Sequence, residues 1–165
     1  MRIRESTDFP GSCEQVFAIR TSGAFQEQKL QRSGALEHSH EVQVEGEHTI
    51  VTTRRAMPTD QLPDVARKFV GDQLVIEERQ DWGPAQADGA RRAAVDIRVA
   101  GVPVTVTGTL ALQPNGSGCR QELDGDLKAG IPFLGGKIEQ AAAPAIAYGF
   151  RIESQLVTEQ LAAGH

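Results

Sequence analysis

The last part of the chain, residues 132–163, has its apolar residues at the spacing of one long helix. At about 100° per residue, the residues that share one stripe are Ile138, Ala142, Ala145, Gly149, Ile152 and Leu156, with Ile146, Phe150, Val157 and Leu161 on one flank. Such a broad apolar face needs a large apolar surface to pack against, and the preceding sequence is rich in strand patterns. The pattern therefore predicts a helix that lies against a sheet.

The beginning of the chain predicts an edge strand followed by two short helices. Residues 2–9 alternate in polarity, as in a strand with one half-buried face. Ser12 followed three residues later by Gln15 resembles a capping box, which would begin a helix that runs to Arg20. A second short helix is expected from Ser22 to Leu30.

The stretch from Leu36 to Met57 predicts a β-hairpin with a turn at Gly46, because its apolar period changes to two. On the first strand His38 and His40 share a face with apolar residues. The turn length decides which second-strand residues lie beside the histidines: a two-residue turn brings Val51, Thr53 and Arg55, and a three-residue turn brings Ile50, Thr52 and Arg54.

The rest of the chain predicts a short helix in the segment from Pro58 to Phe69 and then four strands. These strands are expected at Leu74–Trp82, Arg91–Ala100, Pro103–Gln113 and Cys119–Ala129, joined by short turns. Their alternation predicts an antiparallel sheet with one buried face. The fold class is therefore α+β: a curved antiparallel sheet of about six to seven strands wrapped around a long C-terminal helix, with two short helices after the first strand.

This layout resembles the helix-grip fold of the START-like superfamily, also called SRPBCC. The segments that carry the resemblance are Leu62-Pro63, Lys68–Gly71, Trp82-Gly83, Gly101–Val104 and Ile131–Glu139. Within the superfamily the chain is most similar to an uncharacterised bacterial family, the DUF2505-like domains. The resemblance spans nearly the whole chain and implies a cavity between sheet and helix. Its motifs are structural, so it implies no conserved reaction.

Pro144 departs from the pattern of an uninterrupted terminal helix. Inside a helix it would remove a backbone hydrogen bond and produce a kink near residues 140–142. Alternatively, Pro144 begins the regular part of the helix, and residues 135–143 are a looser lead-in. The sequence leaves both arrangements open.

Composition narrows the range of partners and locations. The 165 residues fit one domain, residues 1–165, and carry a net charge of −5 with no basic run, so a nucleic-acid partner is not expected. No stretch approaches the length of a membrane span, and no apolar signal region begins the chain, which predicts a cytoplasmic protein. Cys13 and Cys119 are expected to be reduced thiols.

His38 and His40 are the most conspicuous candidates for chemistry, since two imidazoles at i and i+2 of a strand point the same way. They could hold a metal or move a proton. No Cys or carboxylate supplies a third ligand at a characteristic spacing, so we favour polar pocket lining or core histidines over metal ligation, and expect no cofactor.

The periodicity also places several charged side chains at or near the inner surface, namely Arg54 or Arg55, Glu78 and Glu153. A buried unpaired charge is costly, so these groups should pair with one another or with the polar end of a ligand. The alternative, which we favour, is that each lies in water at the rim of a cavity or at the end of a strand.

Three functions are compatible with these patterns. The first is the binding of a hydrophobic small molecule or lipid between sheet and helix, where small helix residues leave room. The second is a cyclase or dehydratase with His38, His40, Arg55 and Glu78 as acid-base candidates, and the third is a partner-binding or homodimeric protein. The expected pocket residues are His38, His40, Thr53, Arg55, Leu74, Ile76, Glu78, Val95, Ile97, Val104, Val106, Leu110, Ala142, Ala145, Ile146, Gly149, Phe150 and Glu153.

Overall fold

The computed structural model describes residues 1–60 and 62–164. Its strands are β1 (Arg2–Phe9), β2 (Glu37–Glu45), β3 (His48–Pro58), β4 (Gln73–Trp82), β5 (Arg91–Val99), β6 (Val104–Asn115) and β7 (Gly118–Ala129). Its helices are α1 (Cys13–Arg20), α2 (Gly23–Arg32), α3 (Asp64–Val70) and α4 (Gly135–Ala162). In the part of the chain that is described, the strands form a 7-stranded antiparallel sheet in the order β1-β7-β6-β5-β4-β3-β2.

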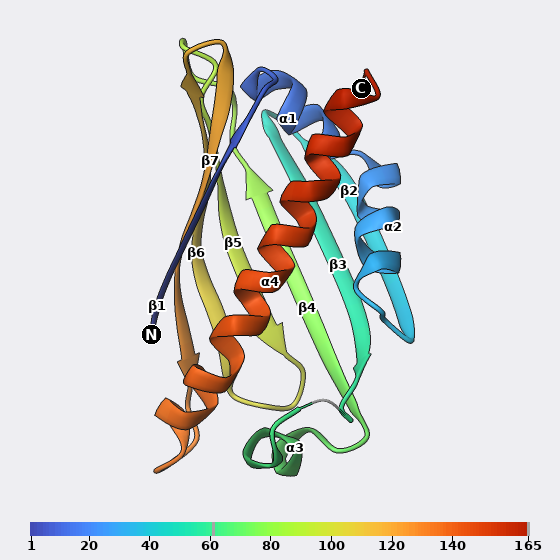
Figure 1. Ribbon diagram of the computed structural model, residues 1–165, viewed down its shortest axis with the longest axis vertical. Helices are drawn as coiled ribbons and strands as arrows, with labels where there is room; N and C mark the ends of the chain where they lie inside the picture. The colour runs from blue at the N-terminus through green and yellow to red at the C-terminus, as the bar shows by residue number, and fades with distance from the viewer. Residues whose placement is uncertain (61, 165) are drawn as a thin grey trace.

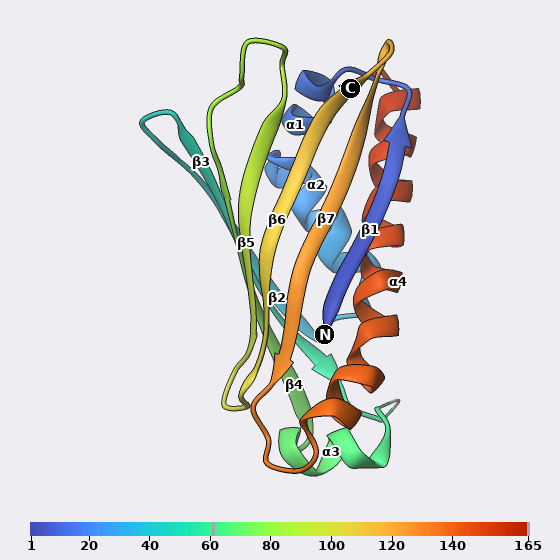
Figure 2. The same cartoon turned by 90° about the vertical axis from the view of Figure 1, so that its left-hand side faces the viewer.

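The sheet is long and curved, and α4 crosses its concave face (Figure 1). Figure 2 shows α1, α2 and α4 on the same side of the sheet, with α3 at one end. Side chains from both layers meet in the core, where Trp82, Leu112, Leu127, Leu156 and Val157 are almost completely buried. The structure therefore confirms the predicted α+β class and the helix-grip arrangement.

Local signals positioned the first elements correctly. The edge strand β1 pairs only with β7 among the described strands, and the capping box at α1 is present. Ser12 Oγ accepts a hydrogen bond from the Gln15 amide at 3.1 Å, and the Ser12 amide donates to Gln15 Oε1 at 2.9 Å. These reciprocal bonds satisfy amide groups that the first turn of a helix leaves without partners.

The β2–β3 hairpin has the two-residue turn. Glu45 pairs with His48, so that His38 lies opposite Arg55 and His40 lies opposite Thr53. Gly46 in the turn has φ 62°, a conformation that glycine adopts without strain.

The segment between β3 and β4 is less helical than predicted. Pro58 belongs to β3, α3 begins only at Asp64, and residue 61 of the predicted segment lies outside the described residues.

Helix α4 begins at Gly135 and continues through Pro144, so the regular helix does not begin at the proline. The proposed loose lead-in over residues 135–143 is therefore wrong, because these residues are already helical. Pro144 is exposed and lies where the helix can lose one backbone hydrogen bond to solvent. A kink at this point stays a prediction.

Two further expectations concern the thiols and the membrane. Cys13 and Cys119 are buried and free, as expected. Burial and the neighbouring Cys13 thiol raise the pKa of the Cys119 thiol well above its usual range. None of the helices in the described residues has both the length and the apolar character needed to span a membrane.

Candidate functional site

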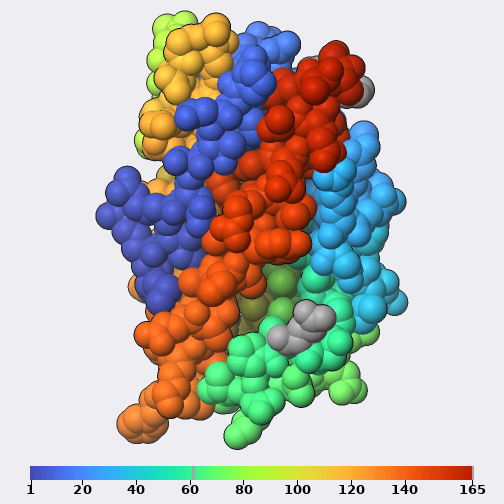
Figure 3. Space-filling model, in the orientation of Figure 1, coloured from blue at the N-terminus to red at the C-terminus, as the bar shows by residue number. Residues whose placement is uncertain are grey.

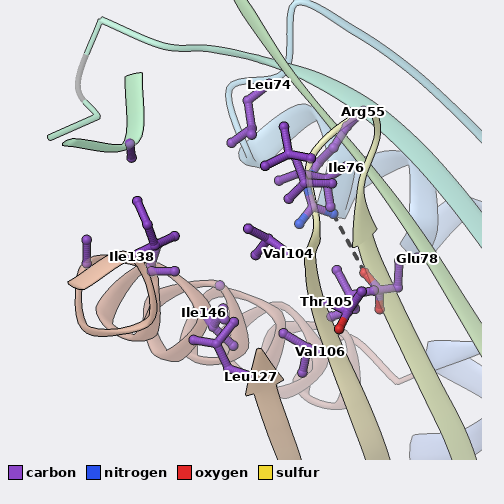
Figure 4. Close-up of a pocket in the computed structure, with 18 of the residues that line it drawn as sticks. Arg55, Leu74, Ile76, Glu78, Val104, Thr105, Val106, Leu127, Ile138 and Ile146 are labelled. Atoms are coloured by element: carbon purple, nitrogen blue, oxygen red, sulfur yellow. Dashed lines mark ion pairs between the residues drawn. The ribbon is translucent and has the colours of Figure 1, made fainter. Parts of the chain in front are cut away.

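A cavity of about 250 Å³ lies between the concave face of the sheet and α4. The space-filling view shows a hollow on this face between α4 and the segment around α3, with atoms of the strands visible behind it (Figure 3). The close-up shows side chains from the sheet and from α4 facing each other across this space (Figure 4).

The walls of the cavity are mostly apolar. The sheet contributes branched apolar residues, including Ile76, Val95, Ile97, Val104 and Val106. Along the strands these alternate with polar residues that point outward. Helix α4 contributes mainly small residues on its facing side, Ala141, Ala142, Ala145 and Gly149, with Ile146 between them. Ala145 and Gly149 line the cavity and are nevertheless exposed. They therefore mark its opening to solvent.

The short helix α3 covers one end of the cavity. Leu62, Pro63, Ala66, Phe69 and Val70 contribute to the lining, yet none of the residues of α3 is buried. An amphipathic helix of two turns with so little burial is held weakly. This end of the wall therefore depends on few contacts.

A cluster of charged side chains forms the polar part of the cavity wall. Glu153 on α4 accepts from Arg20 Nη2 at 2.8 Å and forms an ion pair with Lys29 Nζ at 2.9 Å. Lys29 Nζ also lies 3.2 Å from Glu78 Oε2, and Arg55 Nη1 lies 3.6 Å from the same oxygen. Figure 4 shows the Arg55–Glu78 pair at the edge of the apolar walls. The cluster therefore joins α1, α2, α4 and the middle of the sheet.

Amide and indole groups hold this cluster in place. Gln80 Nε2 donates to Glu78 Oε1 at 2.6 Å, and Trp82 Nε1 in turn donates to Gln80 Oε1 at 3.1 Å. Gln26 Nε2 donates to the Arg20 carbonyl oxygen at 2.6 Å, which fixes the C-terminal end of α1. Buried polar networks of this kind are stable only when their members are paired.

The surrounding charges keep both carboxylates ionised. Burial would raise the pKa of Glu153, but the charges of Lys29 and Arg20 and their hydrogen bonds lower it to about 2. Burial would likewise raise the pKa of Glu78, and the nearby Glu153 adds to this. The Lys29 and Arg55 charges and the Gln80 amide outweigh both, so the pKa of Glu78 is lowered. At neutral pH both groups are anions.

Arg20 is the member of the cluster with unused donors. Its side chain is 1% exposed and forms part of the cavity wall. Only Nη2 donates to a carboxylate; within the described residues, Nε and Nη1 have no hydrogen-bond partner. A buried donor without a partner costs about 1–3 kcal/mol. Arg20 thus lies in the cavity wall with two buried donor nitrogens that have no partner among the described residues.

The predicted pocket residues lie in this cavity wall, with the exception of His38, His40 and Thr53. The two histidines lie beneath α2, where Glu27 Oε2 is 3.2 Å from His40 Nε2 and Glu27 Oε1 is 3.8 Å from His38 Nε2. Thr53 is buried on β3 between His40 on β2 and Glu78 on β4. Helix α2 packs against β2 at this edge of the sheet, and none of the three residues belongs to the cavity wall.

The pattern of the sequence did not indicate Arg20, Lys29 or the residues of α3 as part of the site. A signal for the two cations was present, because Arg20 follows Val16 at i+4 and Lys29 follows Phe25 at i+4, which places both on the buried faces of their helices. No group of three or more His, Cys, Asp or Glu side chains with metal-binding geometry occurs among residues 1–60 and 62–164.

A family model described as "Protein of unknown function (DUF2505)" matches residues 4–161. The chain belongs to the DUF2505 family. This confirms the resemblance predicted from the sequence. Uncharacterised proteins of Mycobacterium tuberculosis and Mycobacterium bovis are similar to this DUF2505 protein, with 26% identity over 110 residues. The match covers 66% of the chain and 63% of each relative, so the chain spans slightly less than two thirds of their length.

Solved structures support the fold of this DUF2505 protein. A protein from Thermus thermophilus superposes with a TM-score of 0.64 at 15% identity, over 99% of each chain. A STAR-related lipid transfer protein from Xanthomonas axonopodis superposes with a TM-score of 0.59 at 12% identity, over 96% of this chain and 84% of that one. At these identities the similarity shows the helix-grip fold alone.

Proposed function

We propose that this protein binds a hydrophobic small molecule or a lipid in the cavity between the sheet and α4, and that it does so in the cytoplasm. The observation that supports this most strongly is the cavity itself: apolar walls, a few polar groups gathered in one place, and an opening lined by Ala145 and Gly149. Ligand sites in proteins commonly combine these features. The similarity of fold to a protein described as a STAR-related lipid transfer protein is in line with this role.

The size of the cavity limits the ligand. Its volume of about 250 Å³ lies just below the range of roughly 300 to 1,000 Å³ that is common for small-molecule sites. The ligand is therefore a small amphipathic molecule or a single acyl or isoprenoid chain, rather than a lipid with two long chains.

We favour binding over catalysis because of the state of the charged cluster. The cyclase or dehydratase hypothesis requires a group that gives or takes a proton in the cavity. Glu78 and Arg55 do meet there, but the pKa of Glu78 is lowered, which makes this carboxylate a poor general base and keeps it from acting as an acid at neutral pH. The cluster is better suited to holding a polar group than to moving protons.

Thermal unfolding with a panel of hydrophobic compounds tests this proposal. A ligand that binds only the folded protein raises the melting temperature with its concentration. The panel consists of medium-chain alcohols, medium-chain acids, isoprenoids and fused-ring aromatic compounds. We expect at least one class to raise the melting temperature of the wild-type protein in a saturable manner.

The variant Gly149→Leu shows whether the binding occurs in this cavity. A Cβ added at Gly149 meets no heavy atom within 4 Å, so a larger side chain is accommodated and occupies the opening. We expect Gly149→Leu to fold and to lose the ligand-induced shift, whereas Gln155→Leu on the exposed side of α4 retains it. The proposal is wrong if no compound stabilises the wild type, or if Gly149→Leu responds as strongly as the wild type.

A further inference from the structure

The charges around the cavity do not balance. The ion pairs of the cluster join the cations Arg20, Lys29 and Arg55 to the carboxylates Glu78 and Glu153. The side chains of Arg20, Lys29 and Glu78 are 1%, 6% and 8% exposed, so solvent contributes little to their compensation, whereas Glu153 and Arg55 are 15% and 19% exposed. The cluster therefore carries one positive charge in excess in a region from which water is largely excluded.

The excess charge can be assigned to Arg20. Lys29 lies between both carboxylates and Arg55 lies beside Glu78, whereas Arg20 donates through Nη2 alone. Elsewhere in the described chain, Nη1 and Nε of Arg20 find no acceptor. The nearest aromatic group, Phe25, has its ring centre 5.8 Å from Arg20 Cζ and offers no conventional acceptor. A buried guanidinium in this situation is stabilised by an additional anion.

We propose that the ligand of this cavity is an amphipathic acid: an apolar body that lies against the walls of the sheet and α4, and a carboxylate or similar anionic oxygen that accepts hydrogen bonds from Arg20. This inference rests on the function proposed above and specifies its ligand class. A carboxylate supplies both the missing negative charge and the missing acceptors. A neutral hydroxyl supplies an acceptor but leaves the charge uncompensated, and an amine adds a further positive charge.

Calorimetric titration with three compounds that share one chain tests the inference at neutral pH. The compounds are decanoate, decanol and decylamine, which differ only in the polar end. Because hydrogen bonds to charged groups contribute more than those between neutral groups, we expect the wild-type protein to bind decanoate at least tenfold more tightly than decanol. Decylamine should bind more weakly than decanol.

The variant Arg20→Met assigns this preference to one side chain. We expect the ratio of decanol to decanoate dissociation constants to fall from tenfold or more to about one, because the anion loses its partner. The matched control is Arg32→Met. It removes an exposed arginine of α2 whose partner, Glu159, lies on α4 as Glu153 does. Arg32→Met should retain the wild-type ratio. If Arg20→Met does not fold, Arg20→Lys, which keeps the charge with fewer donors, should retain only part of the preference.

The outcomes separate the two proposals. Binding of decanoate and decanol with equal affinity to the wild type would overturn the acid-binding inference and leave a hydrophobic binding site in place. An unchanged preference in Arg20→Met would also overturn it. If no member of the decyl series or of the hydrophobic panel binds to the wild type, the proposed function itself is wrong.

Discussion

Glu153 is the residue on which the buried cluster depends most directly. Its side chain lies within 2.9 Å of two cations that belong to different helices, Arg20 on α1 and Lys29 on α2. An ion pair of this kind is not in itself strong evidence of stability, because removing both charges from water is costly. Loss of Glu153 is a different matter, since it leaves Arg20 buried without its carboxylate and Lys29 with Glu78 alone.

This difference predicts unequal effects for two glutamate variants on the same helix. Glu153→Gln should lower the free energy of unfolding by about 3 to 5 kcal/mol, because Arg20 and Lys29 remain buried. Glu159→Gln removes the exposed partner of Arg32 and should cost at most about 1 kcal/mol. Urea denaturation of the two variants measures both values. Similar losses would mean that solvent compensates the buried cations.

The same carboxylates predict how stability depends on pH. The pKa of Glu153 in the folded protein is about 2, below its ordinary value of 4.5, and the pKa of Glu78 is also lowered. A lowered folded-state pKa contributes stability that is complete above the unfolded-state pKa and is lost as the pH falls toward the folded-state value. Stability should therefore be constant above the ordinary carboxyl range and decrease from about pH 4.5 downward.

Urea denaturation at a series of pH values tests this dependence. The measurements are made at high ionic strength, because salt screens exposed ion pairs such as Asp124 with Arg2. The slope below pH 4.5 should be reduced in Glu153→Gln. An equal slope in this variant and in the wild type would assign the acid sensitivity to other carboxylates.

At the residue scale the sequence predicted the direction of a side chain better than its partners. Periodicity placed Glu78 and Glu153 at or near the inner surface and left open whether they pair or lie in water; in the structure both are paired with cations. It could not show that Lys29 joins them, because Lys29 and Glu78 are 49 positions apart and meet only when α2 lies over the sheet. For the same reason His38 and His40 were expected in the cavity: inward direction follows from a period of two, but coverage by α2 does not.

Helix α4 combines helix formation with space for the cavity. Small residues on its facing side keep the cavity open, and glycine is the least favourable of them for the helix, since its backbone loses the most freedom on folding. Gly149 has no positive φ and no close neighbour at the position of an added Cβ. The backbone at residue 149 would therefore accept a residue with a higher helix propensity than glycine.

This predicts that Gly149→Ala stabilises the protein. The free energy of unfolding should rise by about 0.5 to 1 kcal/mol, because alanine fits without contact and favours the helix. Gly136→Ala, also free of close neighbours but in the first turn of α4, should give a smaller gain. Thermal and urea unfolding of both variants measure the difference. A destabilised Gly149→Ala would show that the glycine is required by the conformation of α4.

At the element scale the sequence was informative wherever the pattern was long and regular. The length and inner face of α4, the strands β5 to β7 and the capping box of α1 all follow from local periodicity and local hydrogen bonding. The segment containing α3 was predicted less well, because Pro58 continues β3 and the helix has only seven residues. So short a helix is determined by packing against the end of the cavity more than by its own pattern.

The arrangement of the whole molecule explains why the cavity exists and why only the resemblance could anticipate it. A curved sheet and one long helix do not fit closely along their full length. The C-terminal half of α4 packs into the core through Leu156 and Val157. Residues of the N-terminal half of α4 line the cavity, and α3 covers one end of it (Figure 3). Cavity volume depends on sheet curvature, a property of the complete fold that no sequence window contains.

Native mass spectrometry of the protein purified from its own host tests the central claim, ligand binding in this cavity, most directly. We expect the native mass to exceed the denatured mass by that of one small organic molecule, and the released compound to be apolar with one acidic group. The same preparation of Gly149→Leu should show the bare mass. A wild-type protein that carries no additional mass, under conditions that preserve added decanoate complexes, would contradict the claim that this cavity holds a ligand in the cell.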